Sequence, residues 1–175
     1  MSKRNNIFLV GLMGAGKTTV GKKLARQLGW SFVDTDQEIV ARTGASVATI
    51  FEIEGEAGFR RREAEVIAEL VERTSIVLGT GGGVVLDPSN RARLAAHGWV
   101  VYINVAPYKL AERLRHDRLR PLLQVADPLK RLNTLYEQRN PLYREIADTI
   151  VNGNVMNAKV IAQELKQEIE TECVP

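Results

Sequence analysis

The sequence has little of what marks several classes of protein. It contains one cysteine, Cys173, in 175 residues. A single thiol cannot form an internal disulfide or a cysteine-based metal site, and we therefore expect a reducing compartment, the cytoplasm. No hydrophobic run approaches the roughly 18 residues that a membrane-spanning helix requires, which predicts that the membrane is not a partner.

Aromatic residues and excess basic charge are also scarce. Phe, Trp and Tyr make up 6% of the chain, and 24 Lys and Arg residues stand against 21 Asp and Glu residues, which leaves a net charge of +3. Proteins that bind nucleic acid usually carry a dense basic stripe interleaved with aromatic side chains that stack on bases. We therefore expect no nucleic-acid partner. Local clusters of arginine fit a small anionic ligand better.

The remaining composition is that of a folded domain. Hydrophobic residues make up 45% and charged residues 26% of the chain, which excludes disorder and low-complexity sequence. A length of 175 residues allows one hydrophobic core but hardly two. Because there is no internal repeat and no linker rich in Pro, Ser and Gly, we predict that residues 1–175 form a single domain.

Short apolar runs alternate with longer segments of helical period, a pattern typical of βα units with a parallel sheet. Apolar residues spaced three and four apart predict helices over 17–28 and 56–73. The predicted strands are 7–10, 31–34, 75–78, 99–105 and 149–151. Their continuous apolar character indicates strands covered on both faces. The expected fold class is α/β, a three-layer α/β/α sandwich.

The segment after the first predicted strand matches a phosphate-binding motif. It reads Gly-Leu-Met-Gly-Ala-Gly-Lys-Thr from Gly11 to Thr18, and it opens a predicted helix. The glycines let several backbone N–H groups point inward, and the helix N-terminus adds a positive dipole. Lys17 adds a full charge against the β and γ phosphates, and the Thr18 hydroxyl is placed to coordinate Mg²⁺. A ligand-free turn would explain the glycines but not the Lys-Thr pair. The motif therefore predicts nucleotide binding.

Two acidic residues, Asp34 and Asp36, stand at the end of the second predicted strand. Ligands of open α/β sheets bind beyond the carboxyl ends of the strands, and both carboxylates should therefore overlook the phosphate loop. Residues two apart in an extended segment point the same way, which would permit joint action. The alternative is capping of a helix over 37–42, which could explain either residue but not easily both. Because no acidic residue ends the strand over 75–78, Asp34 is the best candidate for a carboxylate that organises a metal shell.

A glycine-rich segment, Gly79 to Gly83, follows the third predicted strand. Three consecutive glycines remove the side chains from that surface, and backbone N–H groups can then approach a ligand closely. A flexible turn is the alternative. It becomes less attractive because the other two motifs converge on the same edge of the sheet.

Three arginines complete the pattern. Arg60 lies near the start of a predicted helix, Arg120 precedes Pro-Leu-Leu, and Arg139 precedes Asn-Pro-Leu-Tyr. Each one alone would be interpreted as a solvated surface charge.

These motifs occur together in a known family. GLMGAGKTT, DTD, GFR, GTGGG, RPLL and RNPLY stand in the order and spacing of shikimate kinase, and the chain resembles this family from Ile7 to its last helix. The resemblance implies the fold of the nucleoside monophosphate kinase-like phosphate-loop group, with a five-stranded parallel sheet. It also implies an ATP-dependent phosphotransferase with an alcohol group as acceptor. The γ-phosphoryl group of MgATP would pass to the 3-hydroxyl of shikimate and give shikimate 3-phosphate and ADP, in the route to chorismate and the aromatic amino acids.

The resemblance further implies where the nucleotide and its metal ion bind. A mobile lid over about 112–124 would carry Arg120 between the two substrates. Thr18 would ligate Mg²⁺ directly and Asp34 through water. Arg113 and the region of Met156 would approach the adenine. The implied ATP-binding residues are Gly14, Ala15, Gly16, Lys17, Thr18, Thr19 and Arg120.

Four residues would hold shikimate. Asp36 would accept hydrogen bonds from the shikimate hydroxyls and is the expected proton acceptor. Arg60 and Arg139 would hold the carboxylate, helped by the backbone of Gly82 and its glycine neighbours. The predicted catalytic residues are Lys17, Asp36 and Arg120.

Two other interpretations stay open. A different small-molecule kinase, for gluconate or a nucleoside monophosphate, would share the fold and the phosphate loop but would not require Asp36, Arg60 and Arg139 at these spacings. A nucleotide-operated regulatory switch would share nucleotide binding, but a GTP switch would normally show Asn-Lys-x-Asp, which this sequence lacks. The expected partners are shikimate and ATP, with Mg²⁺ as cofactor, and the expected assembly is a monomer.

Overall fold

The computed structural model describes residues 5–118 and 120–172; Leu119 of the predicted lid and Cys173 lie outside the described residues. In chain order the elements are β1 (Asn6–Val10), α1 (Lys17–Leu28), β2 (Ser31–Asp34), α2 (Thr35–Thr43), α3 (Val47–Leu70), β3 (Ile76–Gly79), the 3₁₀ helix η1 (Val84–Leu86), α4 (Pro88–His97), β4 (Trp99–Asn104), α5 (Pro107–Leu114), the 3₁₀ helix η2 (Pro121–Leu123), α6 (Pro128–Ile146), β5 (Thr149–Asn152) and α7 (Ala158–Glu172).

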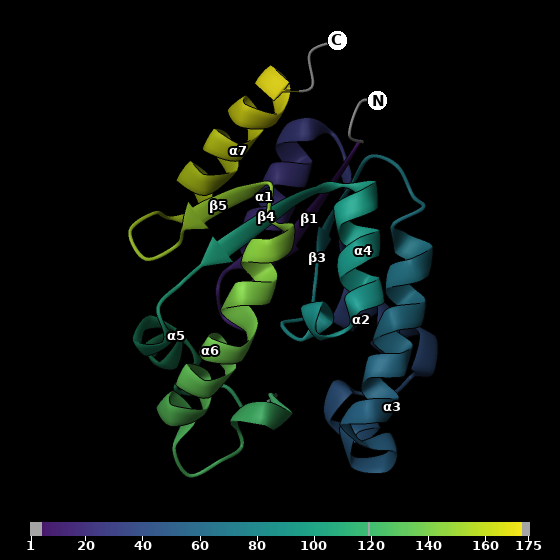
Figure 1. Cartoon of the computed structure of the whole chain (residues 1–175), viewed down its shortest axis with the longest axis vertical. Helices are drawn as coiled ribbons and strands as arrows, with labels where there is room; N and C mark the ends of the chain where they lie inside the picture. The colour runs from purple at the N-terminus through teal and green to yellow at the C-terminus, as the bar shows by residue number, and fades with distance from the viewer. Residues whose placement is uncertain (1–4, 119, 173–175) are drawn as a thin grey trace.

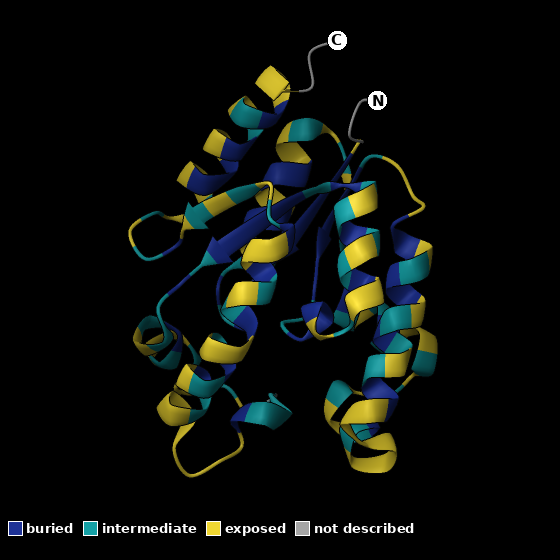
Figure 2. Cartoon of the chain, in the orientation of Figure 1, coloured by how far each residue is buried: buried dark blue, intermediate teal, exposed yellow. Residues whose placement is uncertain are grey.

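The sheet has five parallel strands in the order β2-β3-β1-β4-β5 (Figure 1). β1 lies in the middle, where Phe8 is paired with Leu78 on one side and with Val100 on the other. All three side chains are fully buried, and the burial of each stabilises the fold by about 1.5–3 kcal/mol. Figure 2 shows the same burial along the central strands. The predicted parallel sheet and α/β class are confirmed.

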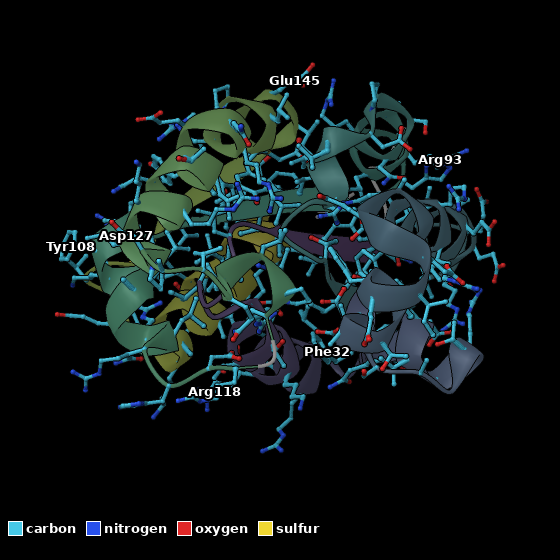
Figure 3. The ribbon with its side chains drawn as sticks, turned by 90° about the horizontal axis from the view of Figure 1, so that it is seen from below. Phe32, Arg93, Tyr108, Arg118, Asp127 and Glu145 are labelled. Carbon is cyan, nitrogen blue, oxygen red and sulfur yellow. The ribbon has the colours of Figure 1, made fainter. Side chains whose placement is uncertain are left out.

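Helices cover both faces of this sheet. α1 packs against α7 on one face, and α4 and α6 lie on the other (Figures 1 and 3). α1 buries Val20, Leu24 and Ala25, at the spacing that predicted the helix. Charged side chains such as Arg93 and Glu145 project outward in Figure 3. None of the described helices is long and apolar enough to cross a membrane.

The largest departure from the predicted elements is α3. It begins at Val47 rather than at residue 56, and its backbone is broken at Gly55, where φ is 70° and ψ is 178°. The first part has its own cap, because the Ser46 hydroxyl accepts a hydrogen bond from the Thr49 N–H at 3.1 Å. This first part is too short to show a helical period in the sequence, and the glycine interrupts the period that follows. The helix over 17–28 and the strand over 31–34 were predicted with the observed ends, and the other predicted ends differ from the observed ones by at most three residues.

Candidate active site

The phosphate loop connects β1 to α1 at the carboxyl edge of the sheet. Gly16 has a φ of 102° and forms the N-cap of α1, a conformation that residues with a Cβ rarely adopt. Lys17 is the first residue of α1 and is 9% exposed. Its Nζ donates hydrogen bonds to the carbonyls of Gly11 at 2.6 Å and Leu12 at 2.8 Å. The loop therefore holds the lysine against its own backbone.

A cavity of about 270 Å³ opens beside this loop. Its position at the N-terminus of α1 favours phosphate groups, because the helix dipole and the free N–H groups both attract anions. Ala15 differs from the other predicted ATP residues: its side chain is buried outside the cavity lining, and its N–H donates to the Leu12 carbonyl at 3.2 Å. The predicted residues that line the cavity are Gly14, Gly16, Lys17, Thr18, Thr19, Asp34, Asp36, Gly82 and Arg120.

Asp34 has two partners. Its Oδ1 accepts from the Gln37 N–H at 3.0 Å and caps α2, and its Oδ2 accepts from the Thr18 hydroxyl at 3.3 Å. The capping alternative is therefore correct for Asp34, but capping is not its only contact. Hydroxyl and carboxylate oxygens are ligands that Mg²⁺ accepts, and the ion usually keeps waters and takes further ligands from substrate phosphates. No cluster of three or more His, Cys, Asp or Glu side chains in the described ranges could hold a metal by itself. The pair therefore fits a Mg²⁺ that arrives with a nucleotide.

Asp36 lies in the first turn of α2, because the extended segment ends at Asp34. The argument that both carboxylates share one face of an extended segment is therefore wrong. Both nevertheless line the nucleotide cavity. Asp36 also lines a second cavity of about 380 Å³, which contains Arg60 and Arg139.

The second cavity holds unpaired polar atoms. Of the six buried side-chain nitrogen and oxygen atoms without a hydrogen-bond partner in the described part of the chain, five belong to its lining. Buried polar groups are nearly always hydrogen-bonded in a native structure. Since these atoms include both donors and acceptors, the cavity suits a ligand that carries an anionic group and hydroxyls. The five atoms are Asp36 Oδ1, Arg60 Nε, Glu63 Oε2, Arg139 Nε and Arg139 Nη1.

Glu63 is a cavity residue that the sequence interpretation missed. It is fully buried, and its Oε1 accepts from Arg60 Nη1 at 3.0 Å. Arg60 also contacts Glu56 at 3.2 Å and lies over the Phe59 ring. The signal in the sequence is the spacing of three between Arg60 and Glu63, which puts both on one side of a helix.

The glycine segment after β3 forms one wall of the second cavity. The Gly81 N–H donates to the Thr35 hydroxyl at 3.0 Å, which removes it from the set of free donors. The N–H groups of Gly82 and Gly83 have no hydrogen-bond partner among the described residues. A Cβ on Gly83 would overlap the Arg60 guanidinium, and the arginine side chain would have to move to make room for it. The sequence predicted this glycine backbone at the ligand but gave no signal for the contact between Gly81 and Thr35, which are 46 positions apart.

Burial shifts the ionisation of several groups in the site. Burial, followed by the charge of Arg120, lowers the pKa of Lys17 to about 7. Burial and then the Asp34 carboxylate raise the pKa of Asp36. Burial raises the pKa of Glu63 to about 7 even though Arg60 opposes the shift. Arg139 has its pKa lowered, mainly by burial.

Arg120, which the sequence analysis placed on a predicted lid, lines both cavities. Its Nε lies 3.4 Å from the Asp117 carboxylate, and its side chain is 42% exposed. Arg113, the predicted adenine residue, donates to the carbonyls of Gly14 and Gly153, each at 3.1 Å. It therefore joins the phosphate loop to the loop after β5. Met156, in that same loop, packs against the core.

Comparison with known proteins gives consistent matches over most of the chain. The sequence model of the shikimate kinase family matches residues 13–170. The shikimate kinase of Dechloromonas aromatica (strain RCB) is 61% identical over 94% of this chain and 90% of the relative. That of Aromatoleum aromaticum is 57% identical over 94% of both chains.

Solved structures give the same family. A shikimate kinase from Acinetobacter baumannii in complex with shikimate superposes with a TM-score of 0.95 at 45% identity, over 98% of this chain and 96% of the other. A gluconokinase from Sinorhizobium meliloti 1021 superposes with a TM-score of 0.67 at 19% identity, over 99% of this chain and 95% of the other, which shows a shared fold alone. Since its likeness to shikimate kinases extends to sequence over nearly its whole length, as the motifs predicted, the chain belongs to the shikimate kinase family.

Proposed function

We propose that this chain transfers the γ-phosphoryl group of ATP to the 3-hydroxyl of shikimate. Family membership makes it an ATP-dependent kinase for shikimate rather than a regulatory switch. The observation that carries the proposal is the junction of the two cavities, which share Met13, Asp36, Gly81, Gly82 and Arg120. A phosphate in one cavity and a hydroxyl in the other would meet beside Asp36 and Arg120.

The nucleotide cavity binds and neutralises the phosphates. Lys17 exchanges its two backbone carbonyls for phosphate oxygens, which are stronger partners because they are charged. Thr18 and Asp34 would hold Mg²⁺, which neutralises phosphate charge when it is bound. The protein mainly positions the reactants in such a reaction, and a rigid loop at a helix N-terminus supplies that positioning.

The second cavity binds the acceptor. The unpaired N–H groups of Arg60 and Arg139 suit the carboxylate of shikimate, and so do the free N–H groups of Gly82 and Gly83. A hydrogen bond to a charged group contributes about 1.5–3 kcal/mol. Acceptors without the carboxylate would leave these buried donors unpaired. The cavity therefore selects against neutral sugars.

Asp36 receives the proton of the attacking hydroxyl. The hydroxyl oxygen forms a bond to the γ-phosphorus, the bond from this phosphorus to the bridging oxygen of ADP breaks, and the hydroxyl proton passes to Asp36. The raised pKa of Asp36 makes it a stronger base than an exposed aspartate. Arg120 reaches both cavities and would stabilise the charge of the transferring group, as the lid closes and excludes water.

We propose further that residues 1–175 form one kinase domain, which acts as a monomer in the cytoplasm without nucleic acid or membrane as a partner. The two most exposed large hydrophobic side chains of the described part, Ile53 in α3 and Val155 in the loop after β5, lie in different segments of the chain. Light scattering in solution would check this: a mass near 19.5 kDa supports a monomer.

The function is tested by initial rates of ADP formation with MgATP and shikimate, gluconate or a nucleoside monophosphate as acceptor. Of the three acceptors, we expect only shikimate to be phosphorylated, and ³¹P NMR should identify shikimate 3-phosphate as the product. Asp36→Asn should lower kcat by roughly 10²–10⁴ with nucleotide affinity near normal. ADP formation that does not depend on any acceptor would overturn the proposal.

A further inference from the structure

Tyr143 of α6 lies against two groups of the acceptor cavity. It is fully buried, and its hydroxyl donates to the Gly82 carbonyl at 2.5 Å. Arg139 precedes it by one helical turn, and the guanidinium lies close enough to interact with the Tyr143 oxygen. A tyrosine hydroxyl has one proton to donate and lone pairs to accept with, and this one therefore contacts Gly82 and Arg139 together.

The hydrogen bond from Tyr143 to the Gly82 carbonyl orients the whole peptide unit between Gly82 and Gly83. A peptide unit is planar, and the described chain has no cis peptide bond. The carbonyl of Gly82 and the N–H of Gly83 therefore point in opposite directions. Since this N–H has no partner among the described residues and Gly83 lines the acceptor cavity, the tyrosine sets the direction of a free backbone donor.

Arg139 and the glycine segment are neighbours in the same wall. A Cβ added to Gly82 would lie 3.3 Å from Arg139 Nη1, and that nitrogen is buried without a partner. The unpaired Arg139 nitrogen thus lies beside Gly82, whose carbonyl accepts the hydrogen bond from the Tyr143 hydroxyl.

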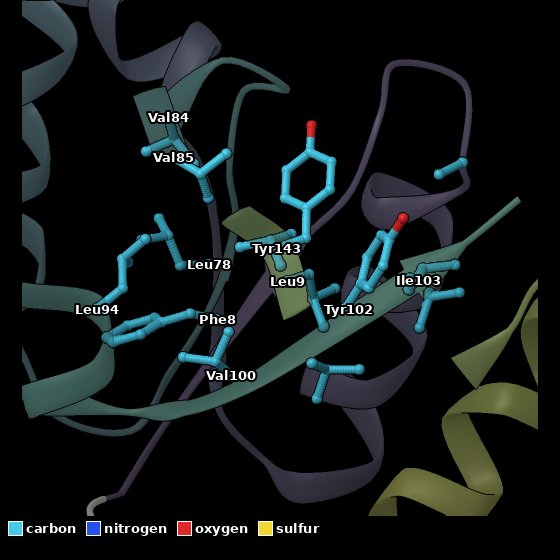
Figure 4. Packing of buried hydrophobic residues seen from close by; sticks show 14 of the residues in the cluster. Phe8, Leu9, Leu78, Val84, Val85, Leu94, Val100, Tyr102, Ile103 and Tyr143 are labelled. Atoms are coloured by element: carbon cyan, nitrogen blue, oxygen red, sulfur yellow. The ribbon is translucent and has the colours of Figure 1, made fainter. Parts of the chain in front are cut away.

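The ring of Tyr143 has a separate role in packing. It lies 4.9 Å from the ring of Tyr102, measured between centroids, and Figure 4 shows the two rings side by side. Phenylalanine would keep this contact, because it differs from tyrosine only by the hydroxyl. The hydroxyl can therefore be tested apart from the ring.

We propose that Tyr143 is a positioning residue for the carboxylate of the acceptor. Its hydroxyl holds the Gly82–Gly83 peptide and the Arg139 guanidinium in the relative placement that receives the anion. The inference rests on the proposed function, since it takes the shikimate carboxylate as that anion. Tyr143 itself does not touch the substrate.

The test compares Tyr143→Phe with the wild-type chain in steady-state kinetics. Losing one hydrogen bond of this kind should raise KM for shikimate about tenfold. KM for ATP should stay within about twofold, because Gly83 and Arg139, the groups that the hydroxyl places, line the acceptor cavity and not the nucleotide cavity. The value of kcat at saturating shikimate should change little. A general loss of structure would instead move both KM values and kcat.

Tyr102→Phe is the matched control. It removes a tyrosine hydroxyl from the neighbouring ring, whose partners are Asn104 and Asn140. Both KM values should be unchanged in this variant. Equal effects of the two substitutions on KM for shikimate, or no effect of Tyr143→Phe, would overturn the positioning role.

A measurement on the unmodified protein covers the case in which Tyr143→Phe does not fold. With tyrosine labelled by ¹³C at Cζ, the Tyr143 signal should shift on addition of shikimate and stay in place on addition of MgADP. A Tyr143 signal whose chemical shift does not change on addition of shikimate would contradict the proposal. Wild-type protein without shikimate-dependent turnover would instead contradict the proposed function, and the two failures are therefore distinct.

Discussion

Lys17 has no acidic partner within hydrogen-bond distance among the residues that the structure describes. Its ammonium is bound by two backbone carbonyls of its own loop, and burial lowers its pKa to about 7. Phosphate groups would replace the carbonyls and restore the charged form, which raises the pKa again. Nucleotide binding should therefore take up a proton at slightly alkaline pH.

Calorimetry can detect this uptake. At pH 8 the free lysine is mostly neutral, since its folded pKa lies below that pH, and ADP binding should take up as much as one proton. The binding enthalpy should then vary with the ionisation enthalpy of the buffer. At pH 6, where Lys17 is already charged, the variation should shrink.

Lys17→Arg supplies the control, because a guanidinium keeps its proton at both pH values. The buffer dependence at pH 8 should be lost in this variant. If wild-type protein and the variant take up the same number of protons, then Lys17 is not the group that titrates.

Residues that belong to motifs were predictable from the sequence, and residues whose role depends on long-range packing were not. Lys17, Asp36, Arg60 and Arg139 belong to motifs whose residue types fit phosphates, hydroxyls and carboxylates, and the structure brings them to two cavities that share lining residues. Tyr143 acts on the carbonyl of Gly82, which lies 61 positions earlier in the chain. Such a contact depends on how α6 packs against η1 and is not encoded in local spacing.

At the scale of elements, the broken helix α3 shapes the acceptor cavity. Its first part contributes Val47, Ala48 and Phe51 to the lining, and its second part contributes Arg60 and Glu63. The break at Gly55 sets the angle between the two parts. Its φ and ψ lie in a region that is essentially reserved for glycine.

Gly55→Ala should therefore change substrate binding. A methyl group meets no atom within 4 Å, which leaves backbone strain as the cause of any effect. The strain costs about 1–3 kcal/mol and favours a straighter helix. We expect a lower melting temperature and a KM for shikimate that is several-fold higher, with KM for ATP unchanged.

Gly29→Ala is the comparison for this prediction. Gly29 also has a positive φ, 69°, and open space around its Cα, but it ends α1 away from the acceptor cavity. Its substitution should lower stability and leave both KM values alone. A similar rise in KM for shikimate in both variants would show that reduced stability, and not the angle of α3, is responsible.

The helices and strands were predictable where the sequence has an uninterrupted apolar run or helical period. The buried strands and α1 were predicted within a residue or so, because apolar runs and a helical period specify them directly. The first part of α3 was missed for the opposite reason. Its eight residues before Gly55 depend on a cap and on packing against α2 and not on a readable period.

At the scale of the whole molecule, each ligand should stabilise the fold through its own cavity. A ligand at a hundred times its Kd adds about 2.7 kcal/mol to the free energy of unfolding. For a chain of this size that raises Tm by roughly 5–10 °C. ADP with Mg²⁺ and shikimate should each produce such a shift in calorimetry.

Arg139→Ala separates the two contributions. In this variant shikimate should raise Tm only slightly, whereas MgADP should raise Tm as it does in the wild-type chain. The reason is that Arg139 lines the acceptor cavity and not the nucleotide cavity. Arg144→Ala, an exposed position on the same helix, should keep both shifts. Equal loss of the two shifts in Arg139→Ala would contradict its assignment to the acceptor.

The lining that the two cavities share has a consequence for inhibitor chemistry. Since Asp36, Gly82 and Arg120 border both spaces, one covalently tethered compound could occupy them at once, with a diphosphate at one end and a polyhydroxylated ring acid at the other. Once one end of the compound is bound, binding of the other end is intramolecular. The tethered compound should therefore bind more tightly than either ligand alone, even though it makes the same contacts.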